Sequence, residues 1–196
     1  MKKIAIFVAS LFILVVAKGQ NTHFGVKGGV NISQLEFSDG TKAESKVGIH
    51  LGGLAHIHLS KTWAIQPELL YSLEGAKKDI NPPVTWNFHY LNVPVLLQYM
   101  FENGFRIEGG PQIGFLLDAN TKYSNVTVDN NEYESTAISL PIGLGYLMSS
   151  GLGLDARYVF GLSNINATKN GNTVHSNVFQ LGLFYQFSDT KQHVPR

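Results

Sequence analysis

Cysteine is absent from the 196 residues, so neither a disulfide nor a thiolate can contribute to the fold or its chemistry. Charge is also scarce: Asp, Glu, Lys and Arg make up 15% of the chain, against about a quarter in an average protein. With 44% apolar residues, this composition disfavours both a disordered chain and a charged, helix-rich soluble domain. The length suits a single domain.

Long apolar runs and helical periodicity are missing beyond the N-terminus. The one apolar run, Ile4–Ala17, follows two lysines and is shorter than the roughly 20 residues that a membrane-spanning helix needs. Small residues stand at Ala17 and Gly19, the two positions that a signal peptidase reads. We therefore predict that residues 1–19 are a signal peptide, cleaved before Gln20, rather than an uncleaved anchor.

A basic stripe is also absent. Cleavage would remove three of the 15 basic residues, Lys2, Lys3 and Lys18, and no acidic one, which leaves 12 basic against 14 acidic residues. This balance, without a cluster of one sign, argues against nucleic acid as a partner. Residues 20–196 form the predicted single domain.

The rest of the chain has a period of two, in which apolar and polar residues alternate as they do in β-strands. The pattern predicts eight strands, each long enough to cross a membrane when tilted, which takes about 9–11 residues. The predicted strands are His23–Ser33, Val47–Leu59, Trp63–Glu74, Phe88–Phe101, Phe105–Leu117, Thr136–Met148, Leu152–Ser163 and Ser176–Phe187.

One face of every predicted strand is free of Asp, Glu, Lys and Arg, while the opposite face carries all the strand charges. The charged positions are Lys27, Glu68, Glu74, Arg106, Glu108, Asp155 and Arg157. Such alternation occurs in two kinds of closed barrel. A membrane barrel has its apolar face outward, whereas a lipocalin-like soluble barrel has that face inward.

Three observations favour the membrane barrel. The charged face also holds many glycines and both signs of charge, which suits a narrow lumen that contains ion pairs. The connections alternate between short turns and long loops, as in outer-membrane barrels, and the predicted long loops are 34–46, 75–87, 118–135 and 164–175. Aromatic residues stand near the strand ends of the apolar face, where interfacial girdles lie. They are Trp63, Phe101, Phe105, Tyr146 and Phe187.

The pattern therefore predicts an all-β fold, an eight-stranded antiparallel up-and-down transmembrane β-barrel. It must close, because an open strand edge would leave unpaired backbone groups in lipid. Prolines inside the predicted strands conflict with a regular ladder, since proline lacks a backbone N–H. We expect β-bulges there, beyond which the two faces of a strand could exchange. The prolines are Pro67, Pro94, Pro111 and Pro141.

Four segments resemble strand motifs of the PorT-like outer-membrane β-barrel family. They are Phe24–Ser33 (FGVKGGVNIS), His89–Tyr99 (HYLNVPVLLQY), Gly109–Leu117 (GGPQIGFLL) and Asp155–Asn166 (DARYVFGLSNIN). The resemblance covers nearly the whole chain after the predicted signal peptide and implies an eight-stranded barrel of the Bacteroidetes outer membrane. The named member of the family is linked to a protein-secretion and surface-attachment system, a role that we do not transfer to this chain.

The inward charges are the main candidate site. Buried charges must be paired, and an eight-stranded barrel is just wide enough for side chains to fill. We therefore interpret these charges as a structural ion-pair network. A proton or ion path and a pair of catalytic carboxylates are alternatives that no pocket motif supports. The network comprises Lys27, Glu68, Arg106, Glu108, Asp155 and Arg157.

His50, His56 and His58 share the inward face of one predicted strand, and histidines two residues apart can bind zinc. No cysteine and no carboxylate of that strand joins them, so we interpret them as polar filling of the lumen. A G-x-S-x-G nucleophile motif is also lacking. The sequence thus predicts a non-enzymatic protein without a catalytic, cofactor or metal site.

We expect the chain to be exported through the periplasm and to lie in the bacterial outer membrane as a monomer, surrounded by outer-membrane lipid, with a structural or surface-interaction role. A surface or secretion-system protein is the expected partner, and the polar, aromatic loop 118–135 could contact it. The alternatives are a soluble periplasmic lipocalin-like barrel that binds a small apolar ligand, and a narrow channel.

Overall fold

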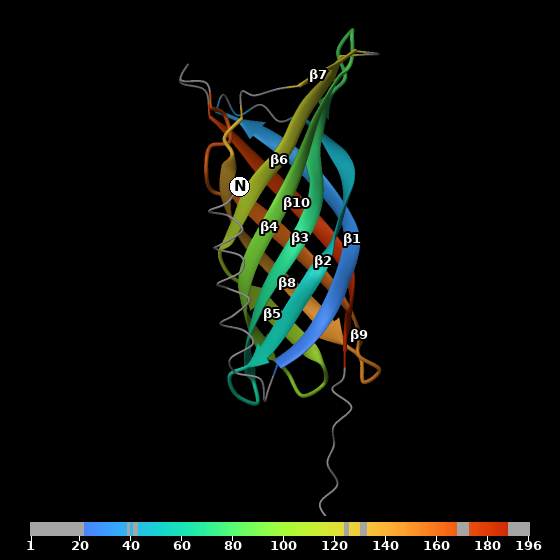
Figure 1. Ribbon diagram of the computed structural model, residues 1–196, viewed down its shortest axis with the longest axis vertical. Helices are drawn as coiled ribbons and strands as arrows, with labels where there is room; N and C mark the ends of the chain where they lie inside the picture. Colours follow the sequence, from blue (N-terminus) through green and yellow to red (C-terminus); the bar gives the residue numbers. More distant parts are fainter. Residues whose placement is uncertain are drawn as a thin grey trace, which may run out of the picture.

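The computed structural model describes residues 22–38, 40, 43–123, 126–129, 133–167 and 173–187. The predicted signal peptide lies outside the described residues. In the part of the chain described, no helix is long and apolar enough to cross a membrane. The strands there are antiparallel and lie obliquely to the long axis of the molecule (Figure 1).

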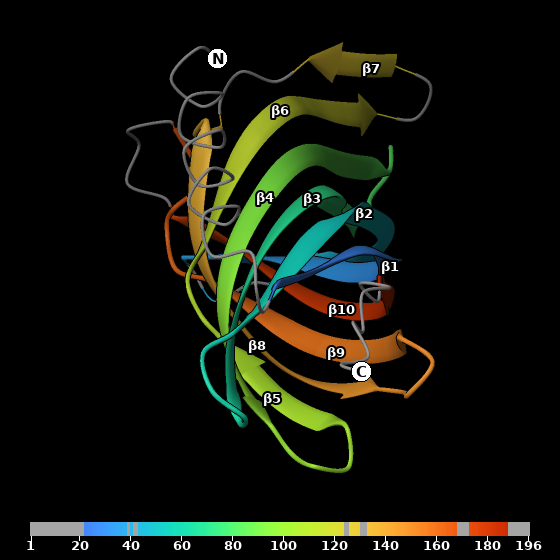
Figure 2. The same ribbon diagram turned by 60° about the horizontal axis from the view of Figure 1, so that its bottom comes forward.

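Ten strands belong to one sheet. They are β1 (Thr22–Phe37), β2 (Glu44–His58), β3 (Trp63–Lys78), β4 (Val84–Met100), β5 (Phe105–Gly109), β6 (Gln112–Tyr123), β7 (Val126–Asp129), β8 (Thr136–Leu147), β9 (Leu152–Gly161) and β10 (Val174–Gln186). The sheet closes on itself, because β1 pairs with both β2 and β10, and β8 pairs with β5, β6 and β9. Figure 2 shows the resulting ring, with β7 beyond it.

β5 and β6 together occupy one place in the ring, since both lie between β4 and β8. The ladder with β8 keeps one register across the break: Gly109 pairs with Ile142, and Gln112 pairs with Ser139. β7 pairs with β6 and forms a hairpin at the end of the barrel where the long connections lie, which is called the loop end below. The ring therefore has eight strand positions, which confirms the predicted eight-stranded antiparallel barrel.

The strands are longer than predicted at the loop end. β1 to β4 have 15 to 17 residues each and take up most of the predicted loops 34–46 and 75–87. In these extensions the two faces change character: Leu35 and Val84 point inward and are buried, while polar residues such as Lys77 point outward. Apolar residues move to the inward face because water, rather than lipid, surrounds this end of the barrel. The sequence pattern of a membrane-spanning strand is therefore lost here, and these segments are predicted as loops.

No bulge occurs at the four strand prolines, which are Pro67, Pro94, Pro111 and Pro141. Each keeps the same pairing register on both of its sides, so the prediction of bulges there is wrong. Proline lacks only the donor, and its carbonyl still takes part in the ladder: the Val95 N–H donates to the Pro111 oxygen at 2.9 Å. The strand faces do not exchange at these positions.

A register change does lie between β4 and β6, where Leu117 has no ladder partner. Gly114 before it and Ala119 after it both face inward, so the faces of β6 exchange at this residue. The exchange explains why the predicted strand ended at Leu117, although β6 continues to Tyr123.

Candidate functional site in the lumen

The outer wall of the barrel is apolar. Large apolar side chains on the outward face are strongly exposed, for example Val47 (69%), Leu51 (65%) and Leu183 (55%). The predicted strand charges face the other way, and none of the seven is more than 6% exposed. A lipocalin-like soluble barrel has its apolar face inward, so this arrangement is the opposite of that alternative.

Aromatic side chains form a continuous group at the end of this wall where the short turns lie, which is called the turn end below. Ring centroids are 5.1 Å apart for Trp63 and Tyr99, 5.0 Å for Tyr99 and Phe101, and 5.6 Å for Phe101 and Phe105. Phe105 in turn pairs with Tyr146 on the next strand. Membrane barrels carry an interfacial girdle at this place, as the sequence predicts.

Arg157 on β9 is the centre of the buried charges. Its Nη1 and Nη2 donate to the two carboxylate oxygens of Glu68, both at 2.7 Å, and its Nε donates to Glu108 Oε1. Lys27 Nζ donates to Asp155 Oδ1 at 2.7 Å, and Arg157 Nε lies 3.6 Å from the same oxygen. These contacts join five charges from four strands across the lumen.

Arg106 lies beside this group. Its Nη1 donates to Gln98 Oε1 at 3.4 Å, and its guanidinium carbon lies 5.2 Å from the ring centroid of Phe184, in a cation–π arrangement. The buried Nε of Arg106 has no hydrogen-bond partner among the described residues. The name charged layer is used below for Lys27, Glu68, Arg106, Glu108, Asp155 and Arg157.

Two glutamines that sequence reasoning missed complete the hydrogen bonds of the carboxylates. Gln66 Nε2 donates to Glu68 Oε1 at 2.7 Å, and Gln98 Nε2 donates to Glu108 Oε2 at 2.6 Å. Gln66 precedes Glu68 by two residues on β3, and Gln98 is the ladder partner of Glu108. Both glutamines occupy inward positions in the period-two alternation, and this is the signal that could have identified them from the sequence.

Glycine makes room for the charged layer, as its abundance on the charged face suggests. A Cβ atom on Gly182 would lie 2.9 Å from Asp155 Oδ2 and 3.0 Å from Lys27 Cε. A Cβ atom on Gly143 would lie 2.6 Å from Arg157 Cγ. A larger residue at either position would displace the charged side chains.

Toward the loop end, the lumen is filled by an apolar cluster. Its members are buried side chains from five strands, from the segment between β1 and β2, and from the segment between β9 and β10. Phe88 also contacts Tyr133, with ring centroids 4.7 Å apart. The name apolar cap is used below for Leu35, Ala43, Ala76, Phe88, Tyr90, Ala119, Ile165 and Val174.

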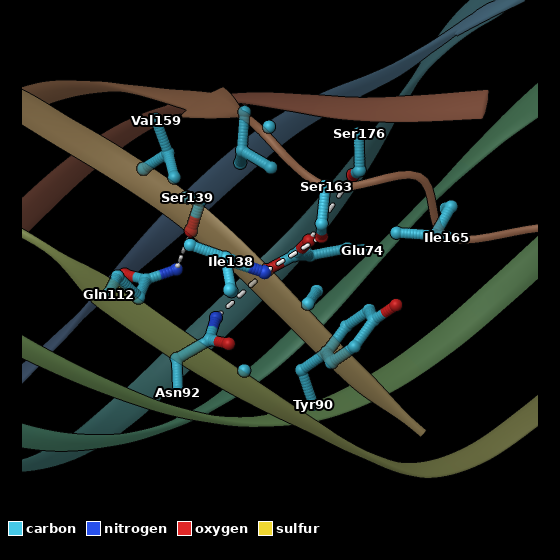
Figure 3. A pocket seen from close by; sticks show the side chains of 14 residues that line it. Glu74, Tyr90, Asn92, Gln112, Ile138, Ser139, Val159, Ser163, Ile165 and Ser176 are labelled. Atoms are coloured by element: carbon cyan, nitrogen blue, oxygen red, sulfur yellow. Dashed lines mark hydrogen bonds between the residues drawn. The ribbon is translucent and has the colours of Figure 1, made fainter. Parts of the chain in front are cut away.

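Glu74 lies close to the apolar cap (Figure 3). Its carboxylate accepts hydrogen bonds from Ser72 Oγ at 3.0 Å, Asn92 Nδ2 at 3.0 Å and Ser176 Oγ at 3.5 Å. Within the described residues, the Glu74 carboxylate has no cationic group within 4.0 Å, although Lys46 Nζ donates to the backbone carbonyl oxygen of Glu74 at 2.9 Å. A cavity of about 20 Å³ borders Glu74 and Tyr90, which is room for one water molecule.

The structure separates the three inward histidines. His50 Nδ1 lies 2.8 Å from Asn31 Oδ1, whereas His56 and His58 lie at the turn end with ring centroids 4.6 Å apart. His23 of β1, which sequence reasoning did not group with them, lies 5.5 Å from His58. The described residues contain no group of three or more His, Asp or Glu side chains that could hold a metal ion.

A closed barrel with an apolar wall, an aromatic girdle and a polar interior is the architecture of integral outer-membrane proteins. Residues 18–167 match the family described as "Outer membrane protein beta-barrel domain", and the chain belongs to this family. It is an integral β-barrel of the bacterial outer membrane, which confirms the predicted location. No curated protein matches the chain.

Solved structures share the fold. Ail, the attachment invasion locus protein of Yersinia pestis, has a TM-score of 0.57 and 15% identity, with 86% of this chain and 100% of that chain covered. Neisserial surface protein A has a TM-score of 0.60 and 14% identity, with 84% of this chain and 97% of that chain covered. Identities this low establish the common fold alone.

Proposed function

We propose that this chain is a non-enzymatic, monomeric barrel of the Bacteroidetes outer membrane and that it is related to the PorT-like proteins. Cleavage of the signal peptide, residues 1–19, gives the mature protein. The loop end of the mature barrel binds a protein of the cell surface or of a secretion system. The observation that most strongly supports this proposal is that side chains fill the lumen. The charged layer and the apolar cap occupy the interior with side chains, which supports a structural or interaction role over transport or catalysis.

The hairpin of β6 and β7 supports the interaction role. Val126 and Val128 are 60% and 48% exposed at the loop end, and Tyr123 is exposed beside them. Exposed apolar side chains on a projecting strand suit the binding of another protein, because the strand offers both backbone groups and apolar contacts.

Fractionation and conductance measurements test the proposal. The mature protein should stay in the outer-membrane pellet through carbonate washing, with Gln20 as its first residue. Purified barrel in planar bilayers should carry no steady ion current, because the lumen is filled. Robust single-channel currents would contradict the proposal and favour the narrow channel.

Affinity purification from native outer membranes tests the partner. The parent barrel should retain a protein that the double variant Val126→Ser/Val128→Ser loses, since the two valines supply the apolar contact. Ile80→Ser is the matched control, because Ile80 is also exposed at the loop end but lies between β3 and β4. Equal recovery by the parent and the double variant would show that the hairpin is not the binding surface.

A further inference from the structure

A hollow of about 580 Å³ lies on the outer wall of the barrel, over β1, β5, β8, β9 and β10. Its side chains belong to two neighbouring rows of outward residues. Two of these residues are small, Gly28 on β1 and Ala156 on β9, whereas the leucines beside them, such as Leu154 and Leu183, are large and exposed. The hollow therefore forms where the apolar wall lacks bulk. It is called the wall hollow below.

The first row of the wall hollow crosses five strands through consecutive ladder pairs. Phe105 pairs with Tyr146, Tyr146 with Leu154, Leu154 with Leu183, and Leu183 with Gly28. Neighbouring strands lie about 4.8 Å apart, so four strand spacings give this row a length of about 19 Å.

The second row lies two residues nearer the loop end on each strand, and it consists of Val30, Leu181, Ala156 and Leu144. Residues between the two rows point into the lumen, so only their backbone faces the hollow. They include Gly29, Gly182 and Asp155, and the Asp155 carboxylate accepts a hydrogen bond from Lys27 inside the barrel. The sides of the hollow are therefore hydrocarbon.

The wall hollow runs obliquely from the membrane interface into the membrane. Phe105 is the first residue of β5 and belongs, with Tyr146, to the aromatic group at the turn end. At the other end of the row, Gly28 is the seventh residue of β1, counted from the turn end. One leaflet of bilayer hydrocarbon is about 15 Å thick, so the length and direction of the hollow fit an acyl chain whose headgroup lies at the aromatic girdle. The turn end of an outer-membrane barrel is periplasmic.

We propose that the wall hollow binds one acyl chain of a phospholipid in the periplasmic leaflet. Lipid surrounds the wall of an integral barrel, and an unfilled hollow would lose van der Waals contacts. A flexible chain can follow the hollow, whereas the convex wall of a second barrel would contact only its rim. Residues 188–196 follow the last strand and include Asp189, Lys191 and Arg196, which do not suit a site within hydrocarbon.

Photo-crosslinking of the mature barrel in vesicles tests this proposal. The probe is phosphatidylethanolamine with a diazirine midway along one acyl chain, and mass spectrometry maps the adducts after illumination. Labelling around Ala156 and Leu181 should be about fivefold stronger than around Leu97, because a chain in the hollow has contacts on several sides. Leu97 on β4 is as exposed as Leu181 but lies outside the hollow. A phosphatidylglycerol probe should give the same pattern, since the hollow binds the chain and not the headgroup.

Gly28→Leu and Ala156→Leu each fill the hollow with a side chain and should lower the labelling around Leu181 about tenfold, because the acyl chain loses its space. A Cβ atom on Gly28 would lie 3.2 Å from Leu51 Cδ1, the end of a flexible side chain that can move. Gly53→Leu is the matched control and should be labelled as the parent is. Gly53 is another glycine of the outer wall, outside the hollow, and its added Cβ would have no contact closer than 3.7 Å.

Heat-modifiable gel mobility verifies that each variant is folded before labelling. The proposal is overturned if the folded parent is labelled evenly around its wall. It is also overturned if Gly28→Leu and Ala156→Leu are labelled as strongly as the parent, if Gly53→Leu loses labelling to the same extent, or if the pattern changes with the headgroup. Loss of the labelling as the ratio of barrel to lipid rises would show instead that a second copy covers the hollow.

Discussion

Glu68 and Glu74 point into the same lumen from β3, six residues apart, yet their surroundings differ. The Glu68 carboxylate accepts hydrogen bonds from both terminal nitrogens of Arg157, whereas the Glu74 carboxylate accepts them from neutral donors, Ser72, Asn92 and Ser176. One glutamate belongs to the charged layer, and the other lies near the apolar cap. The two ends of the lumen therefore satisfy buried polar groups by different means.

The environment outside the wall accounts for this difference. Around the charged layer the outward side chains are apolar and lipid surrounds the barrel, so water cannot reach the buried charges and each needs an opposite charge. In the loop-end extensions of β1 to β4, outward side chains such as Lys77 are polar, and the interior packs like the core of a soluble protein. A single carboxyl group there is satisfied by hydroxyl and amide donors.

Arg157→Met should cause the largest loss of stability, about 3–5 kcal/mol in the free energy of unfolding, because it leaves Glu68 and Glu108 without their cation. Urea unfolding of the barrel in lipid vesicles, followed by tryptophan fluorescence, measures the change. Thr127→Lys on β7 adds a charge at an exposed position and should change stability by less than about 0.5 kcal/mol. An Arg157→Met variant as stable as the parent would show that the charged layer does not hold the barrel together.

Phe88→Ala removes a buried ring from the apolar cap and should cost about 3 kcal/mol, because the cavity it leaves cannot collapse fully. The charged layer remains intact in this variant, so the lumen should stay closed to ions. Unfolding measurements and planar-bilayer recordings on the same preparation examine both points. Steady currents through Phe88→Ala would mean that the apolar cap, rather than the charged layer, closes the lumen.

Glu74→Gln should have the smallest effect, within about 1 kcal/mol, because the amide oxygen can still accept hydrogen bonds from Ser72 and Asn92. The matched variant Glu68→Gln should cost about 3 kcal/mol, since it breaks a buried ion pair. Urea unfolding of the two variants side by side compares the two glutamates directly. Equal losses would remove the distinction between the two ends of the lumen.

The face of the wall to which each strand residue points, its parity, could be predicted from the sequence because the period of two has a simple physical basis. In lipid every outward residue must be apolar, and successive residues of a strand point to opposite faces, so Lys27, Asp155 and Arg157 had to point inward. The same argument places His50, His56 and His58 inward. It failed at Leu117, where an unpaired residue exchanges the faces of β6, and at the loop ends of β1 to β4, where lipid no longer surrounds the wall.

The amino-acid sequence by itself determined the closed β-barrel, its apolar wall and the inward position of its charges, because each of these follows from residue-by-residue contact with lipid. Only the tertiary structure decided which charges meet. Lys27 and Asp155 are 128 residues apart, and Arg157 and Glu68 are 89 apart. Parity places a side chain inside the barrel but says nothing about its depth, and depth depends on strand tilt and on the register of every ladder in the closed ring. The same register brings His23 beside His56 and places the apolar cap at the loop end of the lumen.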